Sequence, residues 1–551
     1  MNELLLADDV DPVTVEVIGS ALSSIVEEMG KAIVRAAYST NIKERHDCST
    51  ALFDAEGRVI AQAERIPIHL GSLLGIAEHV LARHDRADLH PGDVFIGNDA
   101  HTGGGTHLND FVLFEPVFHG GAVVAWVSNL AHHSDFVDRG HAHIFQEGLR
   151  IPPVRLYRAG VLQQDLMDLI LLNCQVPRER IADLRAQMAA NRVGVQRYQA
   201  LCDKYGAGMV SEAASLVLDY AERKTRAGIA RIPDGTYRYE AGFDTNLIDE
   251  TLSLKLAVEA REGDIFFDFA GNPPQVRAGI NMIYTALLAT VYFAVKSLVD
   301  PDIPANAGFH RPIHVAAPEG SVLNALPPAA VYSRTEIAQR LVDMIFAALA
   351  PVIPERVVAA STGGILVTMS GMHPRTGRFY VYNEMCGGGM GARAGKDGLD
   401  GVQVNTTNTA NLPVEALESE HPVMVECYEL VRDSGGPGKF RGGMTMRRRV
   451  RVLDHTATVN AGGCYNLLPP WGLFGGAPGL ACSVELGAGV APFARRNGIL
   501  EPGQTIATIG AAGGGFGDPR QRNRVAVRRD LREERISPEA AREIYGWQDE
   551  A

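Results

Sequence analysis

Seven of the seventeen histidines in this chain fall within 43 consecutive residues, and six of them form, with four aspartates, a candidate set. The set comprises His101, His107, His132, His133, His141 and His143, with Asp99, Asp110, Asp135 and Asp138. Imidazole nitrogens mixed with carboxylate oxygens suit zinc, manganese or iron, and the lack of a nearby cysteine favours a catalytic over a closed structural site. We therefore expect a catalytic centre for a divalent transition metal; surface histidines and helix caps are the alternative interpretation.

Two loops carry this cluster, and both follow predicted strands. The loop at 97–110 links strands expected at 94–97 and 111–114, and the segment at 128–135 completes and follows a strand expected at 122–129. Loops that leave neighbouring strands at one sheet edge can bring imidazoles and carboxylates together. Asp47 could complete the site, although its spacing alone fits a cap or a salt-bridge partner better. His69, which follows a proline-fixed turn, is ambiguous alone.

These loops lie in a region that helices enclose. Apolar residues recur at helical spacing over 11–37, 73–83 and 178–220, the last as a helical hairpin, and 49–54 with 58–62 forms a strand hairpin. From 235 the pattern alternates with period two, and 363–382 is again strand-rich. We expect three regions: 1–232 with the metal site and the helical hairpin, 233–382 as a central α/β region, and 383–551 as a glycine-rich, mostly β region with a short terminal helix at 537–545.

The predicted fold class is mixed α/β (α+β), a large multi-lobed subunit with several mixed sheets and peripheral helices. A chain of 551 residues exceeds one hydrophobic core, and 46% apolar with 21% charged residues excludes a disordered chain. The net charge of −13 disfavours nucleic acid as a partner. The basic run at 447–451 alternates with valines and predicts a strand with a charged face.

No membrane segment is expected, because the longest apolar stretch, 283–295, is too short to cross a bilayer and fits a buried helix. The N-terminus lacks the features of a signal peptide. Seven dispersed cysteines without a Cys-x-x-Cys pair fit free thiols in a reducing compartment. These observations predict a cytoplasmic protein.

Fifty-eight glycines exceed the usual share, and many gather in three clusters at 386–391, 434–443 and 510–517. None of the clusters fits a phosphate loop or a dinucleotide-binding fingerprint. The chain is therefore expected to lack a nucleotide site of its own. Tight turns and close backbone approaches explain the clusters as well as an active-site wall or a partner interface does.

Long motifs in a fixed order resemble the hydantoinase B/oxoprolinase family. This is the metal-bearing subunit type of ATP-dependent N-methylhydantoinases, oxoprolinases and caprolactamase, related to acetone and acetophenone carboxylases. The resemblance covers nearly the whole chain. Its pieces are Asp11–Ile18, Ser39–Ser49, Ile66–Ser72, Gly105–Asp110, Ala131–Asp135, Glu147–Pro153, Asp268–Asn272, Ser434–Gly443 and Gly513–Pro519.

The resemblance implies a metal held by His107, Asp110 and His132, with Asp47 as a fourth ligand. It further implies that four residues contact these ligands or transfer protons: His133, Asp135, His69 and Glu64. This chain departs from the commoner family pattern at His101, where an aromatic residue often stands, and at Asn109, often proline. Neither change removes a proposed ligand.

The resemblance also implies a division of labour. A hydantoinase A-like partner subunit would use ATP and Mg²⁺ to phosphorylate the ring oxygen of a cyclic amide, and this subunit would direct a metal-activated water to the activated carbon, with a histidine or carboxylate as general base. The leading expectation is an ATP-dependent cyclic amide hydrolase of the hydantoinase, 5-oxoprolinase or lactamase type within a hetero-oligomer. The alternative is one component of an acetone- or acetophenone-type ketone carboxylase, and a non-catalytic scaffold is a third possibility.

Overall fold

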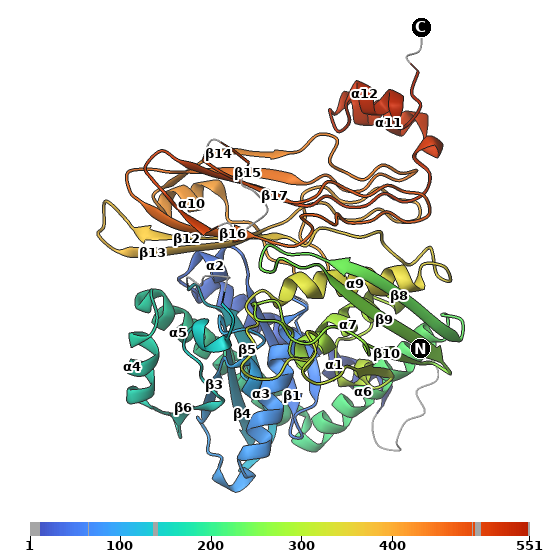
Figure 1. The fold of residues 1–551 in the computed structure, drawn as a ribbon. Coiled ribbons are helices and arrows are strands. Elements are labelled where there is room, and N and C mark those ends of the chain that lie inside the picture. The colour runs from blue at the N-terminus through green and yellow to red at the C-terminus, as the bar shows by residue number, and fades with distance from the viewer. Residues whose placement is uncertain (1–10, 64, 136–140, 488, 491–496, 549–551) are drawn as a thin grey trace.

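The computed structural model describes residues 11–63, 65–135, 141–487, 489–490 and 497–548. Glu64 and Asp138, both singled out from the sequence, lie outside these ranges. Within them the chain forms twelve α-helices and four open sheets (Figure 1). The mixed α/β class with several sheets is therefore confirmed.

The N-terminal part is built on a seven-stranded antiparallel sheet of order β2-β1-β5-β4-β3-β6-β7. Its strands are β1 (Cys48–Asp54), β2 (Val59–Gln62), β3 (Val94–Gly97), β4 (Asp110–His119), β5 (Ala122–His132), β6 (Val154–Arg158) and β7 (Val161–Leu162). The predicted hairpin and all three predicted strands are present, and β5 runs three residues further than expected, to His132.

Helices cover both faces of this sheet. On one face lie α1 (Pro12–Ala36), α5 (Pro177–Tyr205) and α6 (Ala207–Ile229), which pack on Leu52 and Val127; on the other lies α3 (His69–Arg83), which packs on Phe53 and Trp126. Successive strand residues point to opposite faces, so this alternation assigns each residue of β1 and β5 to one helix layer. The predicted N-terminal helix and helical hairpin are confirmed; α3 begins four residues before its predicted start.

A second sheet of order β11-β10-β9-β8 follows, as the period-two pattern predicts. Its strands are β8 (Gly235–Phe243), β9 (Leu252–Arg261), β10 (Asp264–Asp268) and β11 (Ile313–Ala316). Beside it pack α7 (Tyr284–Val299), the expected buried helix, and α9 (Arg334–Leu349), in which every residue is buried. The sequence pattern did not reveal α9, because a helix without an exposed face shows no amphipathic periodicity.

Two further sheets lie above the N-terminal part in Figure 1. One has the order β13-β12-β16-β19 and the other β14-β15-β20-β17-β18. Their strands are β12 (Ile365–Met372), β13 (Phe379–Cys386), β14 (Val423–Leu430), β15 (Met446–Val452), β16 (Ala457–Gly462), β17 (Ser483–Leu486), β18 (Gly489–Val490), β19 (Asn497–Leu500) and β20 (Thr505–Ile509). Strands β12 and β13, which begin in the predicted central region, thus belong to one sheet with β16 and β19 of the predicted C-terminal region. The predicted division into three regions stays a prediction.

The basic run forms β15 with one charged face, as predicted. Arg447 pairs with Glu429 at 3.1 Å and Arg449 with Glu485 at 3.0 Å. Arg448 points to the other face, where it is buried and pairs with Glu384 at 2.8 Å. The remaining helices are short: α2 (Thr40–Lys43), α4 (Gln164–Leu172), α8 (Ala307–His310), α10 (Val414–Glu420), α11 (Arg524–Arg532) and α12 (Pro538–Glu543). Across the described residues every helix is too short or too polar to span a bilayer.

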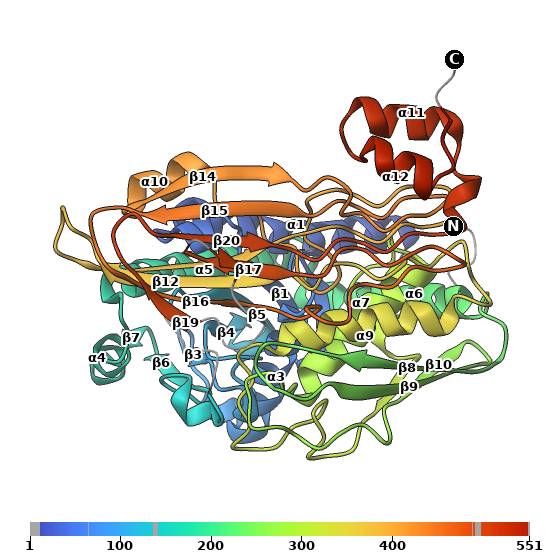
Figure 2. The same ribbon diagram turned by 45° about the horizontal axis from the view of Figure 1, so that its top comes forward.

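The three glycine clusters pack against one another, backbone on backbone, as parallel extended traces beside the β15 sheet (Figure 2). The Gly443 amide donates to the carbonyl of Met390 at 2.8 Å, and the Gly513 amide donates to the carbonyl of Gly443 at 3.0 Å. A Cβ atom on Gly389 would lie 1.9 Å from the Gly443 carbonyl oxygen. Side chains are therefore excluded here, and the interpretation of close backbone approaches is confirmed.

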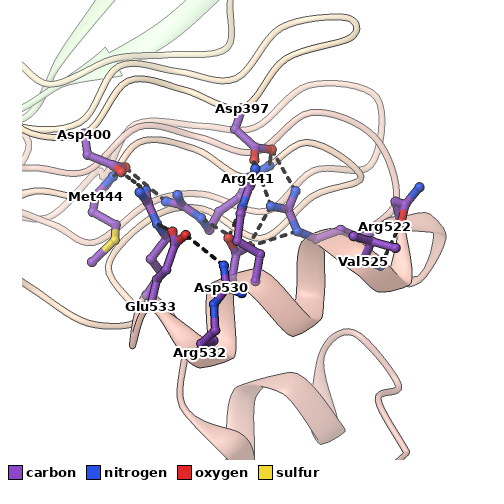
Figure 3. A network of polar contacts seen from close by, with 12 residues as sticks. Asp397, Asp400, Arg441, Met444, Arg522, Val525, Asp530, Arg532 and Glu533 are labelled. Atoms are coloured by element: carbon purple, nitrogen blue, oxygen red, sulfur yellow. Dashed lines mark hydrogen bonds and ion pairs between the residues drawn. The ribbon is translucent and has the colours of Figure 1, made fainter.

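A buried ion-pair network fixes helix α11 to these glycine segments (Figure 3). Asp530 is fully buried and accepts from Arg522 at 2.6 Å, and Arg441 lies 3.7 Å from the same oxygen. Arg522 also pairs with Asp397 at 2.7 Å. The predicted terminal helix is confirmed as α12.

Candidate metal centre

Three acidic and imidazole side chains form one cross-strand row at the end of the seven-stranded sheet. Asp110 is the first residue of β4 and lies directly opposite His132, the last residue of β5. The His132 amide in turn donates to the carbonyl of Asp47, the residue before β1, at 3.0 Å. Residues directly opposite one another on neighbouring strands project from the same face. The sheet register therefore places Asp47, His132 and Asp110 side by side, toward α3.

His107 joins this row through the turn before β4. Its Nε2 lies 2.9 Å from Oδ1 of Asp110, and its ring centre lies 5.0 Å from that of His132. One donor atom each from His107, Asp110 and His132 lie within 4.8 Å of one another, the only such group of three in the described part of the chain. All three residues are buried. The structure thus brings together three of the four predicted metal ligands.

This donor set fits a divalent transition metal. Two donors bound side by side to one octahedral ion at about 2.1 Å lie about 3 Å apart, close to the 2.9 Å between His107 and Asp110. Burial, reinforced by Arg334, lowers the pKa of His107 to about 4, and burial holds the pKa of His132 well below its usual value. Both imidazoles are therefore neutral near pH 7, as metal binding requires. The buried Nδ1 of His107 has no hydrogen-bond partner, which leaves its lone pair or proton unmatched.

Asp110 is held as a carboxylate by a buried arginine. Its Oδ2 accepts from Arg334 at 3.1 Å, from Thr106 at 3.3 Å and from Ser72 at 3.4 Å. Burial opposes ionisation, but His107 and Arg334 outweigh it and hold the pKa of Asp110 well below its ordinary range. Arg334 begins α9, more than two hundred residues along the chain, so no local sequence signal connected it with the site.

His69 extends the row beside Asp47. Nε2 of His69, the first residue of α3, lies 3.5 Å from Oδ1 of Asp47 and 4.0 Å from Oδ1 of Asp110. His46, directly before Asp47, has a φ of 57°, which is unusual for a residue other than glycine, and its carbonyl accepts from the Cys48 amide at 2.8 Å. This tight turn presents Asp47 to His69. A ligand role for Asp47 stays a prediction.

Asn41 and Arg45 orient His132, and sequence reasoning did not single them out. The Asn41 amide nitrogen lies 2.7 Å from Nδ1 of His132 and donates to the His132 carbonyl at 2.7 Å. Arg45 donates to the Asn41 side-chain oxygen and, at 2.6 Å, to the carbonyl of Asn383 in β13. Both residues lie inside the Ser39–Ser49 motif, which was the available signal. Through Asn41 and Arg45, the C-terminal sheet contacts the row of Asp47, His132 and Asp110 with His107 beside it, which we call the metal row.

His133 and Asp135 lie elsewhere. His133 follows the end of β5 and points toward α5, where its Nε2 lies 2.9 Å from Oε1 of Gln187. Asp135 pairs with Arg180 of α5 at 3.0 Å. The backbone of His133 exchanges two hydrogen bonds with Asn109, in the loop that carries His107 and Asp110. The structure therefore brings His69 to the metal row but not the side chains of His133 and Asp135, and Glu64 lies outside the described residues.

Glu147 fixes the segment that leads into α9. Its Oε1 accepts from the backbone amides of Val331 and Tyr332, both at 2.9 Å. Tyr332 then packs its ring 5.8 Å from that of His107, and Arg334 follows. Burial outweighs these hydrogen bonds and raises the pKa of Glu147 to about 8. This contact gives the Glu147–Pro153 motif a structural role next to the metal row.

A small cavity of about 70 Å³ opens over the metal row, between the N-terminal sheet and the C-terminal sheet of β12 and β13. By the same measure one water needs about 10–15 Å³, so several water-sized groups fit. Its apolar wall comprises Ile66, Ile68, Leu366 and Met385, and its polar wall includes Arg45, Tyr332, Arg334, Asn383 and Thr409. A small ring with one polar edge matches this lining.

Known proteins are similar to this chain over most of its length. A family model described as hydantoinase B/oxoprolinase matches residues 11–519. The uncharacterized protein MJ0963 of Methanocaldococcus jannaschii is 37% identical over 97% of this chain and 96% of its own length. A putative D-/L-hydantoinase subunit of Pseudomonas sp. strain NS671 is 32% identical over 98% of this chain and 95% of its own.

Two solved structures share the fold. The crystal structure of ATP-dependent caprolactamase from Pseudomonas jessenii superposes with a TM-score of 0.87 at 29% identity, over 98% of this chain and 96% of that chain. Nucleotide-free acetone carboxylase superposes with a TM-score of 0.88 at 18% identity, over 97% of this chain but 79% of that chain. The second likeness concerns the fold alone.

Proposed function

Because the chain belongs to the hydantoinase B/oxoprolinase family, we propose that it is the catalytic subunit of an ATP-dependent cyclic amide hydrolase. One observation carries this assignment: the row of Asp47, His132 and Asp110, with His107 beside it, lies beneath a cavity large enough for a small ring. The putative hydantoinase and the caprolactamase are relatives named for cyclic amide chemistry. The substrate class is accordingly a hydantoin, 5-oxoproline or similar lactam.

The metal ligands in this proposal are His107, Asp110 and His132, with Asp47 as the fourth. A divalent zinc, manganese or iron ion held there would supply Lewis acidity and lower the pKa of a water ligand toward neutrality. Arg334 keeps Asp110 ionised, and Asn41 fixes the ring of His132. These contacts hold the donor atoms in place before substrate binds.

Proton transfer is assigned to His69. It lies within 4.0 Å of both Asp47 and Asp110 and lines the cavity, so it can take a proton from the attacking water and return it to the leaving nitrogen. His133 and Asp135 are then supporting residues: His133 braces the loop of the metal ligands through Asn109, and Asp135 anchors the segment after β5 to α5. Glu64 keeps the role that the resemblance implies, which is contact with a ligand or proton transfer.

Activation of the amide is assigned to a partner. An amide is a poor electrophile, and phosphorylation of its oxygen by ATP makes the carbon susceptible to water. The hydantoinase and caprolactamase relatives are each named as one subunit of an enzyme, which supports a hydantoinase A-like ATP-binding partner that performs this step with Mg²⁺ in a hetero-oligomer. The sequence of this chain offers no phosphate loop for the purpose.

The test is an assay of the chain reconstituted with its hydantoinase A-like partner. We expect amide-dependent ADP formation coupled to ring opening, and loss of ring opening in His107→Ala and His132→Ala together with loss of bound metal. A Lys31→Ala variant on the surface of α1 is the matched control, with unchanged turnover. Strict bicarbonate dependence, with carbon incorporated into a ketone, would support the ketone carboxylase alternative instead of hydrolysis. Full activity in the variants that have lost the metal would indicate that this chain is a non-catalytic scaffold.

A further inference from the structure

A second and larger cavity lies behind the segment that carries His69. Its volume is about 770 Å³, within the range of about 300–1,000 Å³ usual for small-molecule sites. Residues 65–70 form the partition: Arg65, Pro67 and Leu70 line only the larger cavity, Ile68 and His69 line only the metal cavity, and Ile66 lines both. Thr407 is also common to both. The two cavities are therefore neighbours with a shared wall.

The inner wall of this larger cavity is apolar and aromatic. Tyr292 and Phe293 of α7 and Phe309 of α8 line it, together with Met390 and Val402 from the C-terminal part. His310 stacks on Tyr292 with ring centres 4.0 Å apart, and burial lowers its pKa to about 3, so it adds no charge near pH 7. This surface suits the flat apolar body of a ligand.

The charged residues of the same lining are almost all positive. Arg65, Lys296, Arg356 and Arg393 contribute four cationic groups against one carboxylate, that of Glu355, although the whole chain carries a net charge of −13. Among the described residues Arg65, Arg356 and Arg393 take part in no ion pair, and the buried Nε of Arg65 has no hydrogen-bond partner. A concave wall with one sign of charge concentrates ions of the other sign.

We propose that this cavity binds an organic anion in which an apolar, ring-sized body carries a phosphate or carboxylate group. The body would lie against Tyr292 and Phe293, and the anionic group would face the unpaired arginines. Two sources share this chemistry: a free organic phosphate, and the phosphorylated amide of the reaction proposed above. Only the second source rests on the proposed function. Either occupant would contact Ile66 and Thr407 and so touch the wall of the metal cavity.

Calorimetric titration of the full chain with phenyl phosphate tests this inference. We expect saturable binding that is tighter than that of inorganic phosphate, because the phenyl ring gains the aromatic wall. The double variant Arg356→Gln with Arg393→Gln should weaken binding at least about tenfold, and Ser297→Glu, which adds a negative charge to the lining, should abolish it. The double variant Arg375→Gln with Arg378→Gln, in an exposed turn away from the cavity, removes the same charge and should bind as wild type.

The outcomes separate the alternatives. No saturable binding, or equal weakening in the Arg375/Arg378 control, would overturn the site. Loss of binding in His107→Ala with His132→Ala but not in Ser297→Glu would place the anion in the metal cavity instead.

In the reconstituted complex, a raised KM for the amide in the Arg356/Arg393 variant with unchanged metal content identifies the phosphorylated amide as occupant. An unchanged KM with lost phenyl phosphate binding identifies a free organic anion. Phenyl phosphate binding does not depend on hydrolase activity, so the two proposals fail separately.

Discussion

Replacing Glu147 with glutamine tests whether the buried carboxyl group of Glu147 is neutral and positions the segment that leads into α9 beside the metal centre. Oε1 of Glu147 accepts from the amides of Val331 and Tyr332, both at 2.9 Å, and only 4% of the residue is exposed. Glutamine keeps an acceptor oxygen of the same shape and cannot ionise. We therefore expect Glu147→Gln to fold, to bind metal and to turn over like the wild type at neutral pH.

The magnitude follows from proton linkage. Burial raises the pKa of Glu147 from an ordinary 4.5 to about 8, so between these values the folded chain keeps a proton that the unfolded chain releases. Stability then falls as pH rises, by up to about 1.4 kcal/mol per pH unit and about 5 kcal/mol in all. With an unfolding entropy of about 2.1 cal/mol/K per residue, the whole chain would lose about 4 °C in Tm. In Glu147→Gln this pH-dependent loss of stability should be absent, because glutamine does not titrate.

Differential scanning fluorimetry from pH 5 to 8.5 measures the effect as the gap between the two Tm curves. The Tm of Glu147→Gln should rise steadily relative to the Tm of the wild type as pH rises. Parallel Tm curves would refute the reasoning. Glu147→Ala is the companion variant, because it leaves two buried amides unpaired at a cost of about 1–3 kcal/mol each. It should lose both stability and turnover while glutamine preserves them. Equal turnover in the alanine variant would refute the positioning role.

Four further predictions concern the metal centre and the C-terminal helices. Asp110→Asn should lower bound metal and turnover together, because it removes an anionic donor; unchanged metal by elemental analysis would count against a ligand role. His132→Asn should lose the metal whereas His133→Asn, whose side chain faces α5, should retain it; equal metal contents would contradict this difference. Asn41→Ala should weaken metal binding about 10–100-fold in a chelator competition, since it frees the His132 ring, and wild-type affinity would exclude that role. Asp530→Asn should cost about 3–5 kcal/mol by leaving Arg522 and Arg441 buried without their shared carboxylate, seen as early proteolysis near 520; an unchanged digestion pattern would argue otherwise.

Local periodicity was enough to predict the helices and hairpins that have one exposed face. The helix at 12–36 and the hairpin of α5 and α6 show it in their apolar spacing. Helix α9 does not, because Arg334, Arg340 and Asp343 are as buried as its leucines. The pairing of β12 with β16 was equally inaccessible, since it depends on contacts about ninety residues apart rather than on any local pattern.

The site was predictable where its residues cluster along the chain. His107, Asp110 and His132 stand close in sequence and meet in space, because β4 and β5 are neighbours joined by a hairpin. The local pattern alone could not distinguish His132 from His133, and only the family resemblance pointed to His132. Strand β5 is buried on both faces near its end, so Leu130 and Ala131 give no alternation to indicate the direction of either ring. Arg334 reaches Asp110 only through tertiary packing.

The layered glycine segments have a consequence for the entropic cost of folding. Gly389, Gly443 and Gly513 meet backbone to backbone although about fifty to seventy residues separate them in turn. Glycine loses more conformational entropy on ordering than any other residue, and such distant contacts must close large loops before they gain anything. Ordering this layer therefore carries a large entropic cost, which the contacts of the C-terminal sheets must offset before β12 and β13 can roof the metal cavity.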